Sequence, residues 1–362
     1  MNNERKKIDT IVFISTGYRG GANKYLENNI NYLRKKNLFL VDDNPIKNYK
    51  GIKNKKIDLY KIKPLKEASK LKLFFEKKIV NQKIEKKTLI FFTNYALVIT
   101  NFLLFLKLKK KGIRICIALH SGIFDITIKN SLAILIFSIL AIFVIDKITF
   151  GSNSAKKWWL TKFPWLYFKN NKIIHNGVQI NKIHKKKINK NKIKISFIGR
   201  LEKENNPLLF CEIAKTMFQS QKKKLIFNIF GDGSLKNKVK RYSSFIHLFG
   251  WCDEKYIYKN SDIVLITSPF NNFPYVAIEA KSYGIPVVTC SRGDISKIIK
   301  HKYDGIITSL VQKESIIQSL NEVINKYEFY SNNAINNSRK FDLNTSCKKI
   351  WNFNLNGNNY IR

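Results

Sequence analysis

The residues best suited to chemistry follow Pro274, at a place where a helix can begin. Proline is tolerated in a first helical turn, because its missing N–H would have no partner there. The amides of Tyr275 and Val276 would then face out of the positive end of the helix, which suits an anion such as a diphosphate. Glu279, one turn further along, could reach past the phosphates to a pair of ribose hydroxyls. Taken alone, the pattern also fits an ordinary helix with a solvated glutamate.

Two short apolar runs enclose this helix. Ile263–Ile266 and Pro286–Val288 are rich in aliphatic and β-branched residues, as buried parallel strands are. The segment therefore predicts a strand, a loop, a helix and a second strand, with the candidate anion site at the carboxyl end of the first strand.

Three further strands end in glycine. Each lies in a segment that holds an apolar strand and the residues after it. Segment 195–201 has Gly199-Arg200 after its strand, segment 227–233 has a Gly231-Asp232-Gly233 turn, and segment 246–251 has Gly250-Trp251. Glycine allows the backbone to approach a ligand closely, and the fork of donors on an arginine matches a phosphate. The alternatives are a loop arginine that caps a carbonyl and a tryptophan that only packs.

The N-terminal half offers a comparable set. The apolar run Thr10–Ser15 is followed by Gly20-Gly21 and by a helical pattern that begins at about Asn23. The run Ile113–Leu119 ends at His120, where a parallel sheet would place a ligand-binding residue. Tight-turn glycines and a structural histidine are the alternatives.

Together these segments resemble the family-4 glycosyltransferases of the GT-B fold, the group 1 type. The similarity rests on the following motifs: Asn272-Phe273-Pro274, Glu279-Ala280, Gly284–Val288, Gly199-Arg200, Gly231-Asp232-Gly233, the Gly20-Gly21-Ala22 segment, His120 and Ile173–Val178. Two charged positions of the family differ: its first glutamate falls on Asn271, and its lysine after the Gly-Arg pair falls on Asn205. The resemblance is weak over residues 37–112.

The resemblance implies roles for these residues. It places His120, Arg200, Asn271 and Glu279 at the reacting centre. It assigns to the donor site Gly20, Gly21, Gly199, Arg200, Lys203, Asn205, Gly231, Trp251, Asn272, Phe273, Pro274, Tyr275, Val276 and Glu279. Lys203 would substitute for the lysine that Asn205 replaces, and the backbone of Trp251 would lie beside the nucleotide base. We expect no metal and no other cofactor, because no Asp-x-Asp pair is placed to hold a metal ion.

A chain of 362 residues can form two sizeable cores. We expect an α/β protein with two doubly wound Rossmann-like domains facing across a cleft. Residues 1–180 would be the acceptor-binding domain, the lysine-rich residues 181–191 a linker, and residues 192–340 the nucleotide-sugar-binding domain. Residues 341–362 would cross back and pack on the first domain.

The charge is strongly positive and uneven. Residues 1–190 hold 40 Lys and Arg against 11 Asp and Glu, so +29 of the net charge of +41 lies in this half. Lysine runs beside apolar Phe102–Leu106 suit an anionic membrane surface. Codon bias in an A+T-rich genome is the alternative explanation.

The apolar stretch Ser131–Ile145 is shorter than the about 20 residues of a membrane span, so we expect a buried or interfacial helix. The five cysteines are scattered, with no Cys-x-x-Cys pair, as in reduced cytosolic proteins. The N-terminal ten residues lack the apolar core of a signal peptide. We therefore expect a cytoplasmic protein, with peripheral contact at the inner face of the plasma membrane.

The leading functional hypothesis is a retaining glycosyltransferase of the hexosyltransferase type. It would move a sugar from a nucleoside diphosphate sugar to a glycan or lipid-linked acceptor in the synthesis of bacterial surface polysaccharide, such as lipopolysaccharide or capsule. The first alternative is a catalytically silent protein of the same fold, suggested by Asn205 and Asn271. A basic nucleic-acid-binding protein is the second, although no nucleic-acid-binding motif is visible and we expect no nucleic acid partner.

Overall fold

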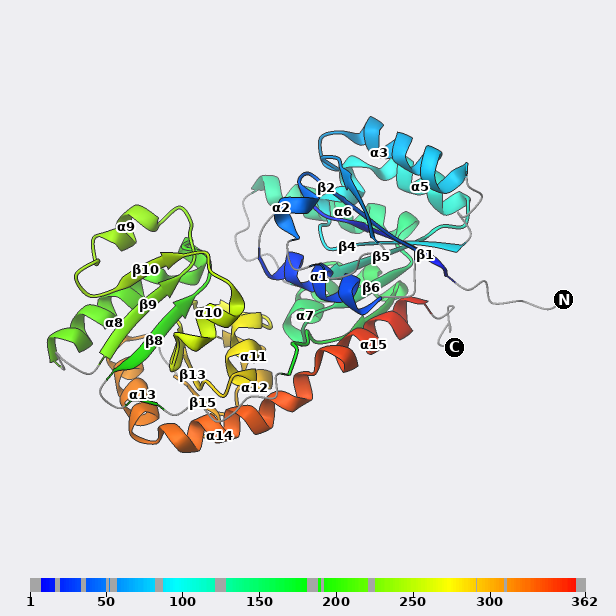
Figure 1. The fold of residues 1–362 in the computed structure, drawn as a ribbon. Helices are drawn as coiled ribbons and strands as arrows, with labels where there is room; N and C mark the ends of the chain where they lie inside the picture. Colours follow the sequence, from blue (N-terminus) through cyan, green and yellow to red (C-terminus); the bar gives the residue numbers. More distant parts are fainter. Residues whose placement is uncertain are drawn as a thin grey trace. The chain divides into compact units, whose positions relative to one another are not determined.

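The computed structural model describes residues 8–16, 20–33, 37–49, 52, 57–81, 87–120, 128–180, 188–189, 192–220, 225–290, 292–308 and 311–355. The chain divides into two compact units (Figure 1). Unit 1 consists of Met1–Asn176 with Asn344–Arg362, and unit 2 of Gly177–Leu343. Of the predicted linker at residues 181–191, all but residues 188–189 lie outside the described ranges.

Unit 1 is built on a parallel sheet in the order β3-β2-β1-β4-β5-β6-β7. Its strands are β1 (Thr10–Ile14), β2 (Asn37–Asp42), β3 (Ile57–Lys61), β4 (Thr88–Phe92), β5 (Arg114–Leu119), β6 (Lys147–Phe150) and β7 (Asn170–Ile173). The central strands are buried along their whole length, as their continuous apolar runs predict. The polar edge strand β7 starts at Asn170, earlier than the apolar pattern from Ile173 indicated, because an edge strand needs no apolar face.

Helices cover both faces of this sheet (Figure 1). They are α1 (Gly21–Tyr32), α2 (Pro45–Asn48), α3 (Ala68–Phe75), α4 (Ala96–Thr100), α5 (Phe102–Lys110), α6 (Ile128–Val144), α7 (Asn153–Lys162) and α15 (Leu343–Leu355). A π-helical turn, Glu76–Val80, extends α3, and a 3₁₀ turn, Pro164–Phe168, follows α7. Helix α1 begins at Gly21, two residues before the predicted start, with Gly20 as the residue that precedes it.

The two faces of the sheet have separate cores. Phe105 of α5, Phe137 of α6 and Trp159 of α7 pack in one cluster with Val12 of β1. Phe13, the next residue of β1, points to the opposite face. Its ring packs edge-on against the ring of Trp351 in α15, with ring centroids 5.8 Å apart. Helix α15 therefore completes the core of unit 1, although its sequence follows that of unit 2. Within the described ranges, no helix is both long and apolar enough to span a bilayer.

Unit 2 has a second parallel sheet, in the order β10-β9-β8-β11-β13-β15. Its strands are β8 (Ile193–Ile198), β9 (Leu225–Phe230), β10 (His247–Gly250), β11 (Ile263–Ile266), β13 (Val287–Thr289) and β15 (Gly305–Ile307), with a small pair β12 (Phe270–Asn271) and β14 (Arg292–Gly293). Its helices are α8 (Pro207–Ser220), α9 (Lys236–Lys240), α10 (Glu254–Lys259), α11 (Tyr275–Ser282), α12 (Ile295–Ile298), α13 (Lys313–Asn325) and α14 (Tyr327–Ser338), with 3₁₀ turns at Lys203–Asn205 and Arg339–Phe341.

Both sheets are doubly wound, which confirms the predicted fold class of each unit. The strand order reverses between β1 and β4 in unit 1 and between β8 and β11 in unit 2. Sheets of this kind bind ligands at the carboxyl ends of the strands, where the order reverses. These two points are therefore the places to look for functional sites.

Candidate functional site

Two glycine loops meet at the reversal point of unit 2. Gly199 follows β8 and Gly231 follows β9, and the amide of Gly199 donates to the carbonyl of Phe230 at 3.0 Å. Gly231 has φ +150°, and a Cβ at this residue would lie only 1.8 Å from the carbonyl oxygen of Gly199. The close backbone approach therefore requires glycine at Gly231.

Arg200 carries an exposed guanidinium directly after Gly199. Its Nη2 donates to Glu204 Oε1 at 2.8 Å, in a pair that is open to solvent. Such surface pairs contribute only about 0–1 kcal/mol, so an incoming phosphate can replace Glu204 at little cost. Asn205 donates from Nδ2 to the carbonyl of Arg200 at 2.8 Å and so holds the loop, while Lys203 is exposed beside it.

The segment before α11 is tied to this loop. Thr267, just after β11, donates from Oγ1 to the carbonyls of Asn205, at 3.1 Å, and Asn206, at 2.8 Å. The side-chain Nδ2 of Asn271 donates to Ser268 Oγ, and Asn272 is half-buried beyond it. Helix α11 then begins after Pro274, as predicted, so the amides of Tyr275 and Val276 belong to its first turn.

Glu279 lies on the buried side of α11. Its side chain is 6% exposed, and Oε2 accepts a hydrogen bond from the hydroxyl of Tyr258 at 2.7 Å. Burial has the larger effect and the Glu279 carboxylate the smaller one, and both raise the pKa of Tyr258 well above its usual value. This hydroxyl therefore stays protonated and donates. Tyr258 could not be predicted as the partner of Glu279, because the two residues belong to different helices, α10 and α11.

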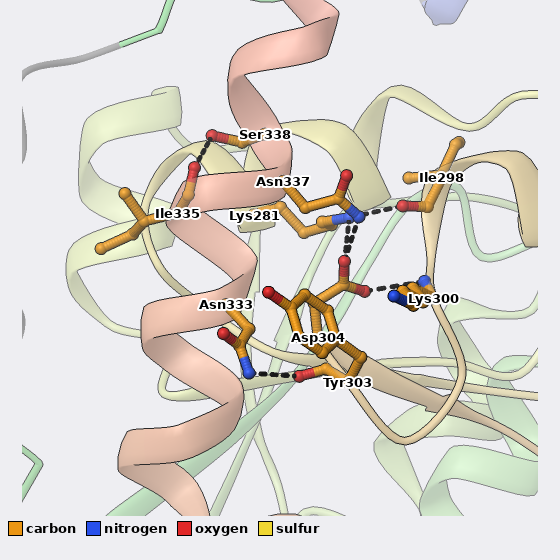
Figure 2. A network of polar contacts seen from close by, with 9 residues as sticks. All are labelled: Lys281, Ile298, Lys300, Tyr303, Asp304, Asn333, Ile335, Asn337 and Ser338. Atoms are coloured by element: carbon orange, nitrogen blue, oxygen red, sulfur yellow. Dashed lines mark hydrogen bonds and ion pairs between the residues drawn. The ribbon is translucent and has the colours of Figure 1, made fainter.

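A buried ion pair holds Lys281 of α11 in place (Figure 2). Lys281 Nζ lies 2.9 Å from Asp304 Oδ2, and both side chains are fully buried. Lys281 also donates to the carbonyl of Ile298, and Asn337 of α14 donates to Asp304. Burial lowers the pKa of Lys281 to about 8, while Asp304 opposes this shift. The network joins α11, α14 and the segment before β15.

Trp251, a predicted donor-site residue, follows a different strand from the Gly199 and Gly231 loops. It follows the edge strand β10, which β9 separates from β8, and its side chain is 49% exposed. The exposed ring has room for a stacking partner, but its role beside a base stays a prediction.

Unit 1 has a cavity of about 240 Å³ at its own reversal point. Thr16 and Asn23 line it from the β1 side, and Asn94 and His120 from the ends of β4 and β5. Asn94 donates from Nδ2 to Thr16 Oγ1 at 3.0 Å. Thr16 and Asn94 were not predicted, although each is the second of two polar residues that follow an apolar strand, which is the signal that could have identified them.

His120 is neutral in this cavity. Burial lowers its pKa to about 4, so the ring carries no charge at physiological pH. Within the described part of the chain, His120 Nε2 and Asn23 Nδ2 are buried and have no hydrogen-bond partner. Both atoms are therefore available to a polar ligand in the cavity, such as a sugar hydroxyl. Gly20, exposed, and Gly21, at the start of α1, also belong to unit 1.

The described ranges contain no group of three His, Cys, Asp or Glu side chains close enough to hold a metal ion.

Comparison with known proteins connects these features to a family. Residues 178–341 match the family model "Glycosyl transferases group 1". A UDP-Gal:alpha-D-GlcNAc-diphosphoundecaprenol alpha-1,3-galactosyltransferase of Escherichia coli is 29% identical over 168 residues, which are 41% of this chain and 43% of that protein. A lipopolysaccharide 1,6-galactosyltransferase of Salmonella typhimurium is 29% identical over 155 residues, 38% of this chain and 42% of that protein.

The chain spans about half the length of the relatives that it matches. The matched part is 43% of the Escherichia coli protein, 54% of a Klebsiella pneumoniae relative and 48% of a Methanocaldococcus jannaschii relative. Solved structures share the fold over nearly the whole chain. HepE of Anabaena, in complex with UDP and glucose, has a TM-score of 0.72 at 16% identity and covers 95% of this chain and 98% of its own. Sucrose-phosphate synthase of Thermosynechococcus elongatus has a TM-score of 0.74 at 12% identity, with the same coverage.

These matches confirm both the predicted GT-B fold class and the resemblance to group 1 enzymes. The residues of the family match include both glycine loops, α11 and the Lys281–Asp304 pair. Residues 178–341 of this chain are therefore similar to the group 1 glycosyl transferases.

Proposed function

We propose that the protein transfers a sugar from a nucleoside diphosphate sugar to a glycan or lipid-linked acceptor, with retention at the anomeric carbon. The acceptor would belong to a bacterial surface polysaccharide such as lipopolysaccharide or capsule. The observation that carries the proposal is the meeting of the Gly199 and Gly231 loops at the reversal point of a sheet whose sequence matches the group 1 family. Two of the relatives, a galactosyltransferase named for a diphosphoundecaprenol-linked sugar and a lipopolysaccharide galactosyltransferase, support it.

Each part of the donor has a candidate partner. Arg200 and the first amides of α11 would neutralise the diphosphate and stabilise charge on the departing nucleotide without a metal. Glu279 would accept hydrogen bonds from the ribose hydroxyls. In unit 1, neutral His120 would bond a hydroxyl of the sugar or acceptor.

A protein that binds the donor without transferring it is the second candidate. The observation in its favour is that Asn205 and Asn271 replace two charged residues of the family. Both side chains make hydrogen bonds within the protein, Asn205 to the carbonyl of Arg200 and Asn271 to the hydroxyl of Ser268. Binding of a nucleotide sugar with neither hydrolysis nor transfer would identify this case.

The direct test is a thermal-shift screen against UDP, GDP and ADP, since a ligand that binds only the folded state raises its apparent stability. With the nucleotide that binds, Arg200→Ala should weaken affinity in calorimetry by about 1.5–3 kcal/mol, the range of hydrogen bonds to charged groups. The control is Glu204→Gln, which releases Arg200 from its partner and should leave affinity equal or slightly higher. Unchanged affinity of the Arg200 variant, or activity abolished by EDTA, would contradict the metal-free diphosphate site.

Glu279→Gln should bind the same nucleotide more weakly by about 1–3 kcal/mol, because a carboxylate that accepts two ribose hydroxyls is lost. The variant should also discriminate less between the nucleotide and its 2′-deoxy form. Tyr258→Phe is the control, since it removes the internal partner of Glu279 and leaves the carboxylate in place. If both variants lower the melting temperature alike and neither changes the preference for the 2′-hydroxyl, Glu279 has only a structural role.

The proposal includes contact with the inner face of the plasma membrane. Along α6, the side chains Leu132, Leu135, Ile136, Ile139 and Phe143 are exposed on one helical face. Leu103 of α5 is 71% exposed and Phe168 is 90% exposed. Apolar surface beside lysines suits an anionic bilayer, to which each lysine near the surface adds about 1 kcal/mol.

In cosedimentation, the protein should therefore bind anionic vesicles at low salt, lose this binding as salt rises, and bind neutral vesicles weakly. Ile139→Glu should reduce binding, whereas Val311→Glu, an exposed apolar position of unit 2, should not. Equal binding to both lipid types, or none, would remove the membrane from the proposal and favour a soluble acceptor.

A further inference from the structure

A second cavity of unit 1 lies apart from the strand ends, between α3 and α5. Its volume is about 520 Å³, which is within the roughly 300–1,000 Å³ usual for small-molecule sites. Phe75 and Leu108 are buried at its base, with Val80, Ile99 and Leu104 around them. We call this cavity the α3–α5 groove. Its mainly apolar lining suits a hydrocarbon chain rather than a sugar or a nucleotide.

Positive charge surrounds the α3–α5 groove. Lys72 borders it from α3, and Lys107 and Lys111 border it from α5 and the turn that follows. Glu76 is the acidic residue of the lining and lies 3.8 Å from Lys72, in an exposed pair. Lys107 and Lys111 thus add net positive charge next to an apolar surface, which suits an amphiphile with an anionic head.

Two structural features support a binding role for the groove. Its α3 wall continues as the π-helical turn Glu76–Val80, and such turns are rare and frequently occur at functional sites. Phe102, which also lines the groove, packs its ring edge-on against Phe143 of α6, with centroids 6.5 Å apart. The groove therefore adjoins the exposed apolar face of α6.

We propose that the α3–α5 groove binds one hydrocarbon chain that carries a phosphate head. The chain would lie over Phe75 and Leu108, and the phosphate would meet Lys107 and Lys111. This goes beyond the proposed function, because neither the donor site nor the His120 cavity takes part. A polyprenyl phosphate and a single-chain phospholipid share this chemistry.

Calorimetry with monomeric amphiphiles, below their critical micelle concentrations and without vesicles, tests the proposal. Dodecyl phosphate and farnesyl phosphate are the probes, and their relative affinities distinguish a straight chain from an isoprenoid chain. Dodecyl maltoside, with the same chain and an uncharged head, should bind at least about tenfold more weakly than dodecyl phosphate, as loss of the charged contacts predicts. Inorganic phosphate alone should not bind measurably.

Two variants locate the site. Ser69→Trp, at an exposed position of the lining, should fill the groove and abolish binding of both probes. Lys107→Glu with Lys111→Glu should weaken both at least about tenfold. The matched control is Lys215→Glu with Lys238→Glu, the same charge change at exposed positions of unit 2. Nucleotide binding should be unchanged in all of these variants, so failure of the donor site and failure of the groove are separate results.

The proposal is overturned if the Ser69 variant binds the probes as the wild type does, or if charge reversal in the groove and in the control has the same effect. Equal binding of dodecyl phosphate and dodecyl maltoside would also overturn it, because an apolar groove alone explains that result. So would a wild type that dimerises without lipid, binds no probe, and becomes monomeric on Ser69→Trp, since the occupant is then a second copy of the chain.

Discussion

Gly231→Ala should destabilise unit 2 by about 4 kcal/mol or more and abolish nucleotide binding, an effect at the upper end for a single substitution. The added Cβ would lie 1.8 Å from the carbonyl oxygen of Gly199, and a backbone atom cannot rotate away as a side chain can. The loop that carries Arg200 would have to move. Chemical denaturation and nucleotide titration of the same samples measure both effects.

Gly20→Ala is the matched control, because Gly20 has nearly the same backbone angle, φ +154°, but no atom within 4 Å of an added Cβ. Its cost should be the conformational strain alone, about 1–3 kcal/mol. Equal losses at Gly20 and Gly231 would mean that the contact between the two glycine loops is not what requires glycine.

Asp304→Ala should lower the free energy of unfolding by about 3–5 kcal/mol, because the charge of Lys281 would remain buried without its partner. The double variant Lys281→Met with Asp304→Leu should recover most of this loss, since it leaves no buried charge. Asp232→Ala, which breaks the solvent-exposed pair with Lys236, is the control and should cost at most about 1 kcal/mol. Denaturant unfolding of the four proteins gives the comparison.

The pH dependence offers a second readout of this pair. In the wild type, the folded chain loses the Lys281 proton near pH 8, before the unfolded chain does, so this residue adds stability as pH rises from about 8 toward 10.5. Without Asp304 the pKa of Lys281 falls further. Stability of the Asp304 variant should therefore already increase with pH below 8, where this residue gives the wild type no slope. A variant that matches the wild type at every pH would show that the pair contributes nothing.

The sequence alone determined the parts that depend on local order. Apolar runs such as Ile263–Ile266 form strands wherever both faces are covered, and they were placed to within a few residues. Glycine and proline act through their own backbone, so the turns at Gly199 and Gly231 and the start of α11 after Pro274 could be predicted. The sequence therefore identified the fold class and the segments that face the site.

The tertiary structure decided which side chains meet. Tyr258 reaches Glu279 from a different helix, and Lys281 reaches Asp304 across 23 residues of sequence. Arg200 has Glu204 as its partner, and His120 is neutral, because burial and neighbours set these states and no local pattern encodes them. Likewise, the sequence shows α5 and α6 as apolar, but only packing on the sheet determines which of their faces stay exposed. Strand order, a property of the whole chain, brings these distant residues together.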